Sequence, residues 1–136
     1  MITDTVTIAQ FVKDHRITMT AERTDRNPNM EDSAAMDHWK CVLRCSGHSM
    51  TVPFSMGYGH NGKEPKAEMV LDAIASDSAS VDNCRGFEDW CNDFGYEMDS
   101  RKAERIFKTC EHQAKRLRSF LGDGLYKQLL YDTERE

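Results

Sequence analysis

One stretch of the chain, Asp99 to Leu121, repeats its apolar residues at the spacing of a single helix face. Its apolar positions are Ala103, Ile106, Phe107, Cys110, Ala114, Leu117 and Leu121. Spacings of three and four residues are typical of an amphipathic α-helix. At 1.5 Å per residue this helix would be roughly 33 Å long, enough to cross a small domain. The rest of the chain must supply an apolar surface of matching length, so this stretch constrains the fold most.

The other side of the predicted helix is basic. It carries Arg101, Arg105, Lys108, His112, Lys115 and Arg116. From 101 to 118, seven Lys and Arg stand against two Glu, a net charge of +5, while the whole chain carries −5 and the remainder therefore −10. This balance argues against non-specific nucleic-acid binding by the molecule as a whole. It leaves open a local basic patch, or an acidic patch that meets a basic partner.

Length and composition indicate one domain, 1–136. A chain of 136 residues with 39% apolar and 30% charged residues has a modest core. The N-terminal sequence MITDTVTIAQF has no basic region followed by an apolar region, so we expect no signal peptide. No apolar run approaches the roughly 20 residues of a membrane span. We expect a cytoplasmic protein.

The N-terminal part, 1–63, combines a helix with three strands. The helix is predicted over Asp4–His15, capped by Asp4 or Thr5. Alternating apolar and polar residues predict strands over Arg16–Glu22, His38–Cys45 and Met50–Met56. A polar connection, 25–37, links the first two, and Pro53 favours an edge position for the third. Short or polar links predict an antiparallel meander with one covered face.

The C-terminal part, 64–136, is predicted to be helical. One helix has Pro65 in its first turn and runs to about Ala75, followed by a polar linker, 77–86. A short helix, Phe87–Phe94, ends at Gly95, and the long helix follows a cap at Asp99 or Ser100. A final turn or two covers Leu125–Tyr131. The predicted fold class is α+β, in the order α-β-β-β-α-α-α, with the helices packed on one face of the sheet.

The sequence predicts neither a metal site nor a disulfide. The five cysteines are odd in number and include no C-x-x-C pair. Cys41 and Cys45 share one face of a strand about 13 Å apart, too far for a disulfide. We therefore expect free thiols, no metal and no cofactor.

Three local patterns match functional motifs but are better explained by structure or by chance. Gly57 to Gly62 matches G-x-G-x-x-G, but no strand follows the next helix, so a plain loop is favoured over a dinucleotide site. Asp93-Phe94-Gly95 matches a kinase triplet by letters only and is interpreted as a helix end. The α-β-β-β-α start is similar to double-stranded RNA-binding domains, but only Lys63 and Lys66 would serve phosphate contacts.

The sequence offers no candidate catalytic residues. No Cys or Ser is paired with a His and an orienting acid at readable spacing. Trp39 and Trp90 are predicted to be core residues rather than stacking platforms. We expect a protein that is not an enzyme.

Several stretches resemble a family of small, mostly uncharacterised proteins encoded by phages and prophages of Gram-negative bacteria. They are ITMTAERTDRNPNM (17–30), WKCVL (39–43), VPFSMGYG (52–59), VLDAIASD (70–77), FEDWCNDFGYEMDSRKAER (87–105) and LGD (121–123). The resemblance implies an anti-defence role, with anti-CRISPR inhibitors among the candidates, and no catalytic residue. The implied partner is a host defence complex such as a type I CRISPR effector, bound stoichiometrically so that its nucleic-acid or partner binding is blocked.

Two surfaces could carry such binding. The helix could dock through Arg101, Arg105, Lys108, Lys115 and Arg116 on an acidic protein face. Alternatively, acids of the polar connection, Asp25, Glu31, Asp32 and Asp37, could mimic phosphates in a basic channel. The alternative function is a small nucleic-acid-binding phage regulator that uses the basic face of helix 100–121; direct nucleic-acid binding is otherwise not expected.

Overall fold

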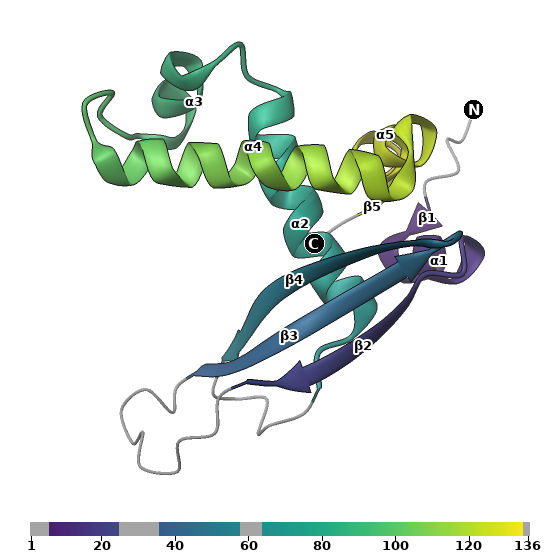
Figure 1. Cartoon of the computed structure of the whole chain (residues 1–136). Helices are drawn as coiled ribbons and strands as arrows, with labels where there is room; N and C mark the ends of the chain where they lie inside the picture. Colours follow the sequence, from purple (N-terminus) through teal and green to yellow (C-terminus); the bar gives the residue numbers. More distant parts are fainter. Residues whose placement is uncertain (1–5, 25–35, 58–63, 135–136) are drawn as a thin grey trace.

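The computed structural model describes residues 6–24, 36–57 and 64–134 as an α+β fold (Figure 1). A three-stranded antiparallel sheet is covered by helices, and two further short strands pair near the two ends. The elements are β1 (Val6–Thr7), α1 (Ile8–Asp14), β2 (Thr18–Arg23), β3 (Met36–Cys45), β4 (His48–Gly57), α2 (Ala67–Asp82), α3 (Phe87–Phe94), α4 (Arg101–Leu121), α5 (Asp123–Tyr131) and β5 (Thr133–Glu134). The predicted fold class is confirmed.

The sheet is the predicted meander, in the order β2-β3-β4. Ser46 and Gly47 join β3 to β4 with φ angles of 49° and 83°, the left-handed pair that a tight two-residue hairpin requires. The inward side chains of β3 and β4 that are buried are Trp39, Cys41, Leu43, Cys45, Met50, Val52 and Met56. Phe54, which lies between Val52 and Met56 on the same side of β4, is half-buried. Pro53 is exposed on β4, which is an edge strand as predicted.

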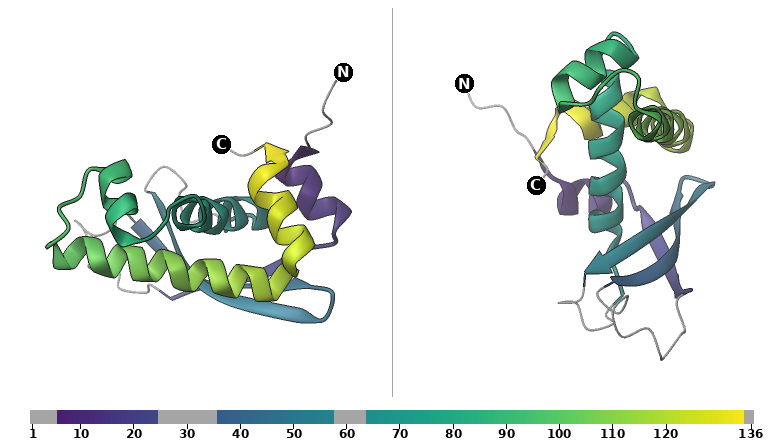
Figure 2. Two further views of the ribbon diagram at one scale, coloured as in Figure 1. Left: turned by 90° about the horizontal axis from the view of Figure 1, so that it is seen from above. Right: turned by 90° about the vertical axis from the view of Figure 1, so that its left-hand side faces the viewer.

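Helices pack against one face of this sheet. α2 begins beside the sheet and extends away from it. α4 crosses the part of α2 that lies away from the sheet (Figures 1 and 2). One apolar cluster joins Phe11 of α1, Leu71 of α2, Leu117 of α4 and Leu129 of α5 to the inward side of β3 and β4. This main core therefore holds the C-terminal half of α4 against the body of the molecule.

A second, smaller cluster lies around α3. Its buried residues are Trp90, Cys91, Ala103 and Phe107. Trp90 stacks on Tyr96 with ring centroids 5.1 Å apart and meets Phe107 edge-on at 5.4 Å. The N-terminal half of α4 is thus held by an aromatic cluster that is separate from the main core.

Helix α2 is longer than predicted. It continues to Asp82, through the Ser- and Asp-rich residues 77–82 that the sequence assigned to a linker. Ser78 is buried and donates to the Ile74 carbonyl at 2.8 Å, while Ser80 donates to the Asp77 carbonyl at 2.7 Å. These local hydrogen bonds satisfy the serine hydroxyls inside the helix. The helix therefore continues despite the low helix propensity of Ser and Asp. The helix also begins later than predicted: its N-cap is Lys66, so Pro65 lies before the first turn.

The two ends of the described chain pair with each other. Val6 pairs with Thr133 and Thr7 with Glu134 in a parallel ladder. The first helix therefore starts at Ile8 rather than Asp4, and its cap is Thr7, whose side chain accepts from the Gln10 amide at 3.1 Å. Strands of two residues carry no periodic pattern, so the sequence did not reveal them. β3 also begins at Met36, inside the predicted polar connection.

None of the helices in the described segments has the length and apolarity needed to cross a membrane.

Candidate functional site: the basic side of helix α4

A capping serine and a glycine set the two ends of helix α4. The Ser100 side chain accepts from the Ala103 amide at 3.1 Å and caps the first turn. Gly122, with φ 84°, ends the helix and donates its N–H to the Arg118 carbonyl. The 21 residues between these ends form an uninterrupted helix, as the apolar repeat predicted.

One side of α4 is buried along its whole length. Its buried residues are Ala103, Phe107, Cys110, Leu117, Phe120 and Leu121. Ile106 and Ala114, which the sequence placed on the same side, are half-buried. Phe120 was missed by the sequence interpretation because it lies at the margin of the apolar repeat.

The opposite side of α4 presents a straight row of basic side chains. Arg101, Arg105, Lys108, His112 and Lys115 are all exposed. Their spacing of four, three, four and three residues keeps them on one line along the helix. At 1.5 Å per residue the line is roughly 21 Å long. We call these five residues the basic row; four of them are predicted partner-binding residues.

Two other arginines of α4 are held against the protein. Arg116 is half-buried and donates from Nη2 to the Thr51 carbonyl of β4, and from Nη1 to Gln113 at 3.4 Å. Arg118 reaches Asp123 at 3.1 Å and Asp82 at 3.7 Å, and its guanidinium lies 4.5 Å from the centre of the Tyr126 ring. Among the predicted binding residues of α4, Arg116 is thus the one that lies half-buried against β4, while the other four are exposed.

Glutamates flank the basic row. Lys108 Nζ lies 2.8 Å from Glu104 Oε1, one turn earlier on the helix. The hydrogen bond from Lys108, with its charge, lowers the pKa of Glu104, and the same contact raises the pKa of Lys108. Glu111 is exposed beside the row. The exposed side of α4 therefore carries the basic row with two glutamates, seven residues apart, along one side of it.

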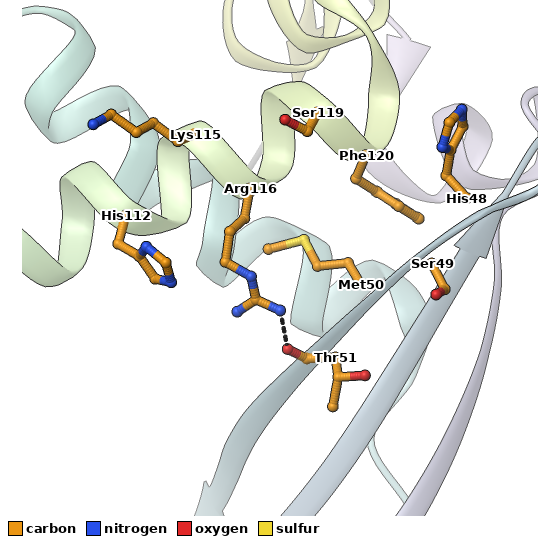
Figure 3. Close-up of a pocket in the computed structure, with 9 residues that line it drawn as sticks. All are labelled: His48, Ser49, Met50, Thr51, His112, Lys115, Arg116, Ser119 and Phe120. Atoms are coloured by element: carbon orange, nitrogen blue, oxygen red, sulfur yellow. Dashed lines mark hydrogen bonds between the residues drawn. The ribbon is translucent and has the colours of Figure 1, made fainter.

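A groove separates α4 from the edge strand β4 (Figure 3). Its volume is about 600 Å³. The lining residues are His48, Ser49, Met50, Thr51, His112, Lys115, Arg116, Ser119 and Phe120. All four ionisable side chains among them are basic. In Figure 3, Arg116 spans the groove to Thr51, and His112 lies one turn earlier on α4.

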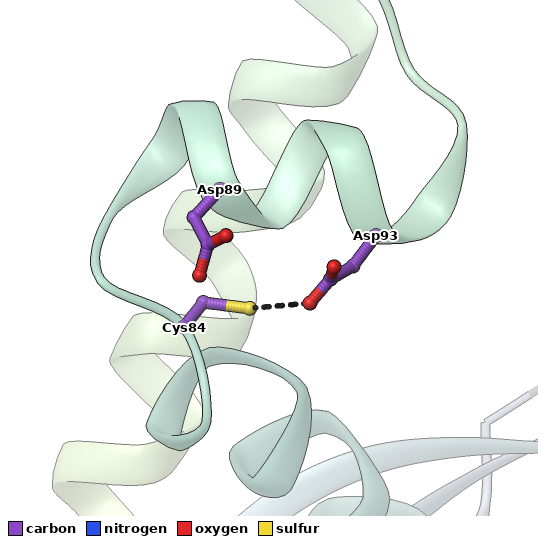
Figure 4. Close-up of side chains that lie close together, drawn as sticks. All are labelled: Cys84, Asp89 and Asp93. Atoms are coloured by element: carbon purple, nitrogen blue, oxygen red, sulfur yellow. Dashed lines mark hydrogen bonds between the residues drawn. The ribbon is translucent and has the colours of Figure 1, made fainter.

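A cysteine and two aspartates meet beside α3 (Figure 4). One ligand atom each of Cys84, Asp89 and Asp93 lies within 4.8 Å of the others, a mixed sulfur and oxygen set. The Cys84 thiol lies 3.5 Å from Asp93 Oδ2 and 3.1 Å from the Ser80 carbonyl, and the Arg85 amide donates to Asp89 at 3.0 Å. Burial and the two carboxylates raise the pKa of Cys84. The Cys84 thiol is thus protonated and acts as a hydrogen-bond donor at neutral pH. These hydrogen bonds explain why the three side chains lie close together.

The cysteines are free thiols, as predicted. Burial raises the pKa of Cys41, Cys91 and Cys110. A raised thiol pKa disfavours the thiolate, which is the nucleophilic form. These residues are therefore core groups. Trp39 and Trp90 are also buried, as predicted.

The other predicted site residues lie apart from this side of α4. Asp25, Glu31 and Asp32 fall outside the described residues, as does most of the G-x-G-x-x-G stretch. Asp37 lies in β3, paired with Met56, and its side chain is outside the described part. The triplet at 93–95 is a helix end, as interpreted, with Gly95 in the left-handed region at φ 74°.

No protein-family model, curated protein or solved structure matches this chain.

Proposed function

We propose that this chain is a phage-encoded anti-defence protein that binds a host defence effector, such as a CRISPR complex, stoichiometrically in the host cytoplasm. The basic row of α4 carries the proposal. Its five side chains are exposed on a helix whose opposite side is anchored in two apolar clusters. A rigid, pre-formed row loses little backbone freedom on binding, which favours recognition of a surface. The anti-defence role itself follows from the resemblance described above.

An acidic protein face is the partner that this row fits best. Glu104 and Glu111 interrupt the positive charge beside the row. Residues 86–100, next to its N-terminal end, contain five acids and no Lys or Arg. A uniformly anionic phosphate backbone would be repelled by these acids, whereas a protein face can place its own cations opposite them. The row thus supports docking by the helix rather than phosphate mimicry.

A nucleic-acid-binding regulator is the second candidate. A basic line of roughly 21 Å is long enough to follow several phosphates. The observation in its favour is the exposure of the whole row.

The test is capture of the host complex by charge-reversed variants. Arg101→Glu/Arg105→Glu reverses two exposed members of the row, leaving the Lys108–Glu104 pair intact. Lys13→Glu/Lys127→Glu makes the same charge change on α1 and α5, at exposed positions away from the row. The tagged protein is purified from a host that carries defence complexes.

The row variant should lose the complex and the protection of phage, while the control variant should keep both. Inhibition should saturate at a fixed ratio of inhibitor to effector. Equal capture by the two variants would exclude the row as the docking surface. Complete inactivation by sub-stoichiometric amounts would show turnover and would end the binding-only proposal.

A further inference from the structure

We propose that the groove between α4 and β4 binds an extended, carboxylate-rich segment of the partner protein. This inference rests on the proposed function, since it names what the partner presents to this side of α4. His112 and Lys115 belong to both the basic row and the groove lining, so the two form one continuous surface. The groove extends that surface from the helix to the sheet.

The charge of the groove selects an anion. Arg116 and Lys115 contribute two positive charges, His48 and His112 are the other ionisable side chains, and no Asp or Glu is among the described residues that line the groove. Within the described residues, neither Lys115 nor Arg116 lies within 4 Å of a carboxylate. A carboxylate that enters the groove therefore meets cations without displacing an internal ion pair.

Arg116 is positioned before any partner arrives. The Thr51 carbonyl and the Gln113 side chain each accept one of its N–H groups. A guanidinium has five N–H donors, so it can hold these two acceptors and still donate to a carboxylate. Fixing this side chain in advance lowers the entropy lost on binding.

The edge strand favours an extended segment. In an antiparallel hairpin, successive residues direct their main-chain groups alternately to the partner strand and away from it. The contact from Arg116 to the Thr51 carbonyl shows that Thr51 directs its main chain away from β3, and Ser49 shares this direction. An extended peptide laid along β4 can therefore pair with the main chain of Ser49, while Arg116 keeps the Thr51 carbonyl and faces the side chains of the peptide. The volume of about 600 Å³ is in the range of ligand sites.

The test uses the purified full chain and three labelled probes in fluorescence anisotropy: octaglutamate, octaglutamine and a nine-residue oligothymidylate with eight phosphates. Arg116→Glu places a negative charge in the groove. Lys127→Glu makes the same charge change at an exposed position of α5, outside both the row and the groove lining. His112→Gln removes a groove group at an exposed position, and circular dichroism checks that each variant is folded.

Octaglutamate should bind, and Arg116→Glu should weaken it by about tenfold or more, the loss expected for a charge-assisted contact. His112→Gln should weaken it in the same direction. Lys127→Glu should change it by less than about threefold, because this residue lies outside the groove lining and salt screens charges beyond roughly 8 Å. If Arg116→Glu does not fold, the comparison of His112→Gln with Lys127→Glu decides.

Three results would overturn the inference. The first is that octaglutamine binds as tightly as octaglutamate, and the second is that Lys127→Glu weakens octaglutamate binding as much as the groove variants do. The third is that oligothymidylate binds more tightly than octaglutamate and depends on Arg116. The last result would favour the nucleic-acid alternative. Effector capture that needs Arg105 but not Arg116 would leave the proposed function standing and exclude the groove.

Discussion

At the scale of single residues, Asp82 links three elements at the end of α2. Its carboxylate accepts from the Tyr131 hydroxyl and from the Tyr126 hydroxyl at 3.5 Å, both in α5, and lies 3.7 Å from Arg118 of α4. The hydrogen bond to Asp82, followed by burial, raises the pKa of Tyr131 to about 12. The protonated phenol is thus the form that the fold favours.

This contact gives a dependence on alkaline pH. Because the folded pKa of Tyr131 is above the unfolded value near 10, its contribution to stability is complete below about pH 10 and is lost as pH rises toward 12. Tyr131→Phe should lower the free energy of unfolding at pH 8, and the difference from the unmodified protein should shrink by pH 12. Urea unfolding across this range measures both, and subtraction cancels the cysteine titrations. A difference that stays constant with pH would contradict the assignment.

At the scale of elements, the two halves of α4 pack into different apolar clusters, so mutations in them should change the free energy of unfolding by different amounts. Leu117 is fully buried in the main core, whereas Ile106 is half-buried beside the α3 cluster. Leu117→Ala should cost about 2–5 kcal/mol of unfolding free energy, the range for a deleted core side chain. Ile106→Ala should cost clearly less, because it leaves a smaller cavity. Equal losses in urea melts would contradict the two-cluster description.

Helix α3 should be less protected from amide hydrogen exchange than the central strand β3. Its support is the small aromatic cluster, with Trp90 and Cys91 as its own buried residues. Amide hydrogen exchange should show α3 opening before the central strand β3. Trp90→Phe should speed exchange in α3 and leave β3 unchanged. Equal acceleration in both elements would mean that the two clusters unfold as one.

Regular patterns made most of these elements predictable. The apolar repeat of α4 and the alternation around Trp39 and Val52 each depend on many residues, so single exceptions did not obscure them. The extension of α2 to Asp82 could not be predicted, because it depends on Ser78 being buried and bonded to Ile74. The basic row was predicted. The inward turn of Arg116 was not, since it depends on where β4 passes α4.

At the scale of the whole molecule, an acidic segment lies directly before the basic side of α4. The basic row starts beside residues 86–100, which include Glu88, Asp89 and Asp93 of α3. The protein alone should bind duplex DNA or RNA with a dissociation constant of about 10⁻⁴ M or weaker near physiological salt. Anisotropy with labelled duplexes measures this. Micromolar binding that Arg101→Glu/Arg105→Glu abolishes would instead favour the nucleic-acid regulator.

The parallel pair of β1 and β5 has a mechanical consequence. A force that pulls Val6 and Glu134 apart acts on opposite ends of this ladder and loads it in shear, so its hydrogen bonds share the tension. Stretching cannot reach the sheet or α4 until these two residue pairs separate. Once they do, the tension passes directly to α1 and α5, which hold Phe11 and Leu129 in the main core. Among the ladders of the described residues, this two-pair ladder is therefore the one that we expect to resist stretching first.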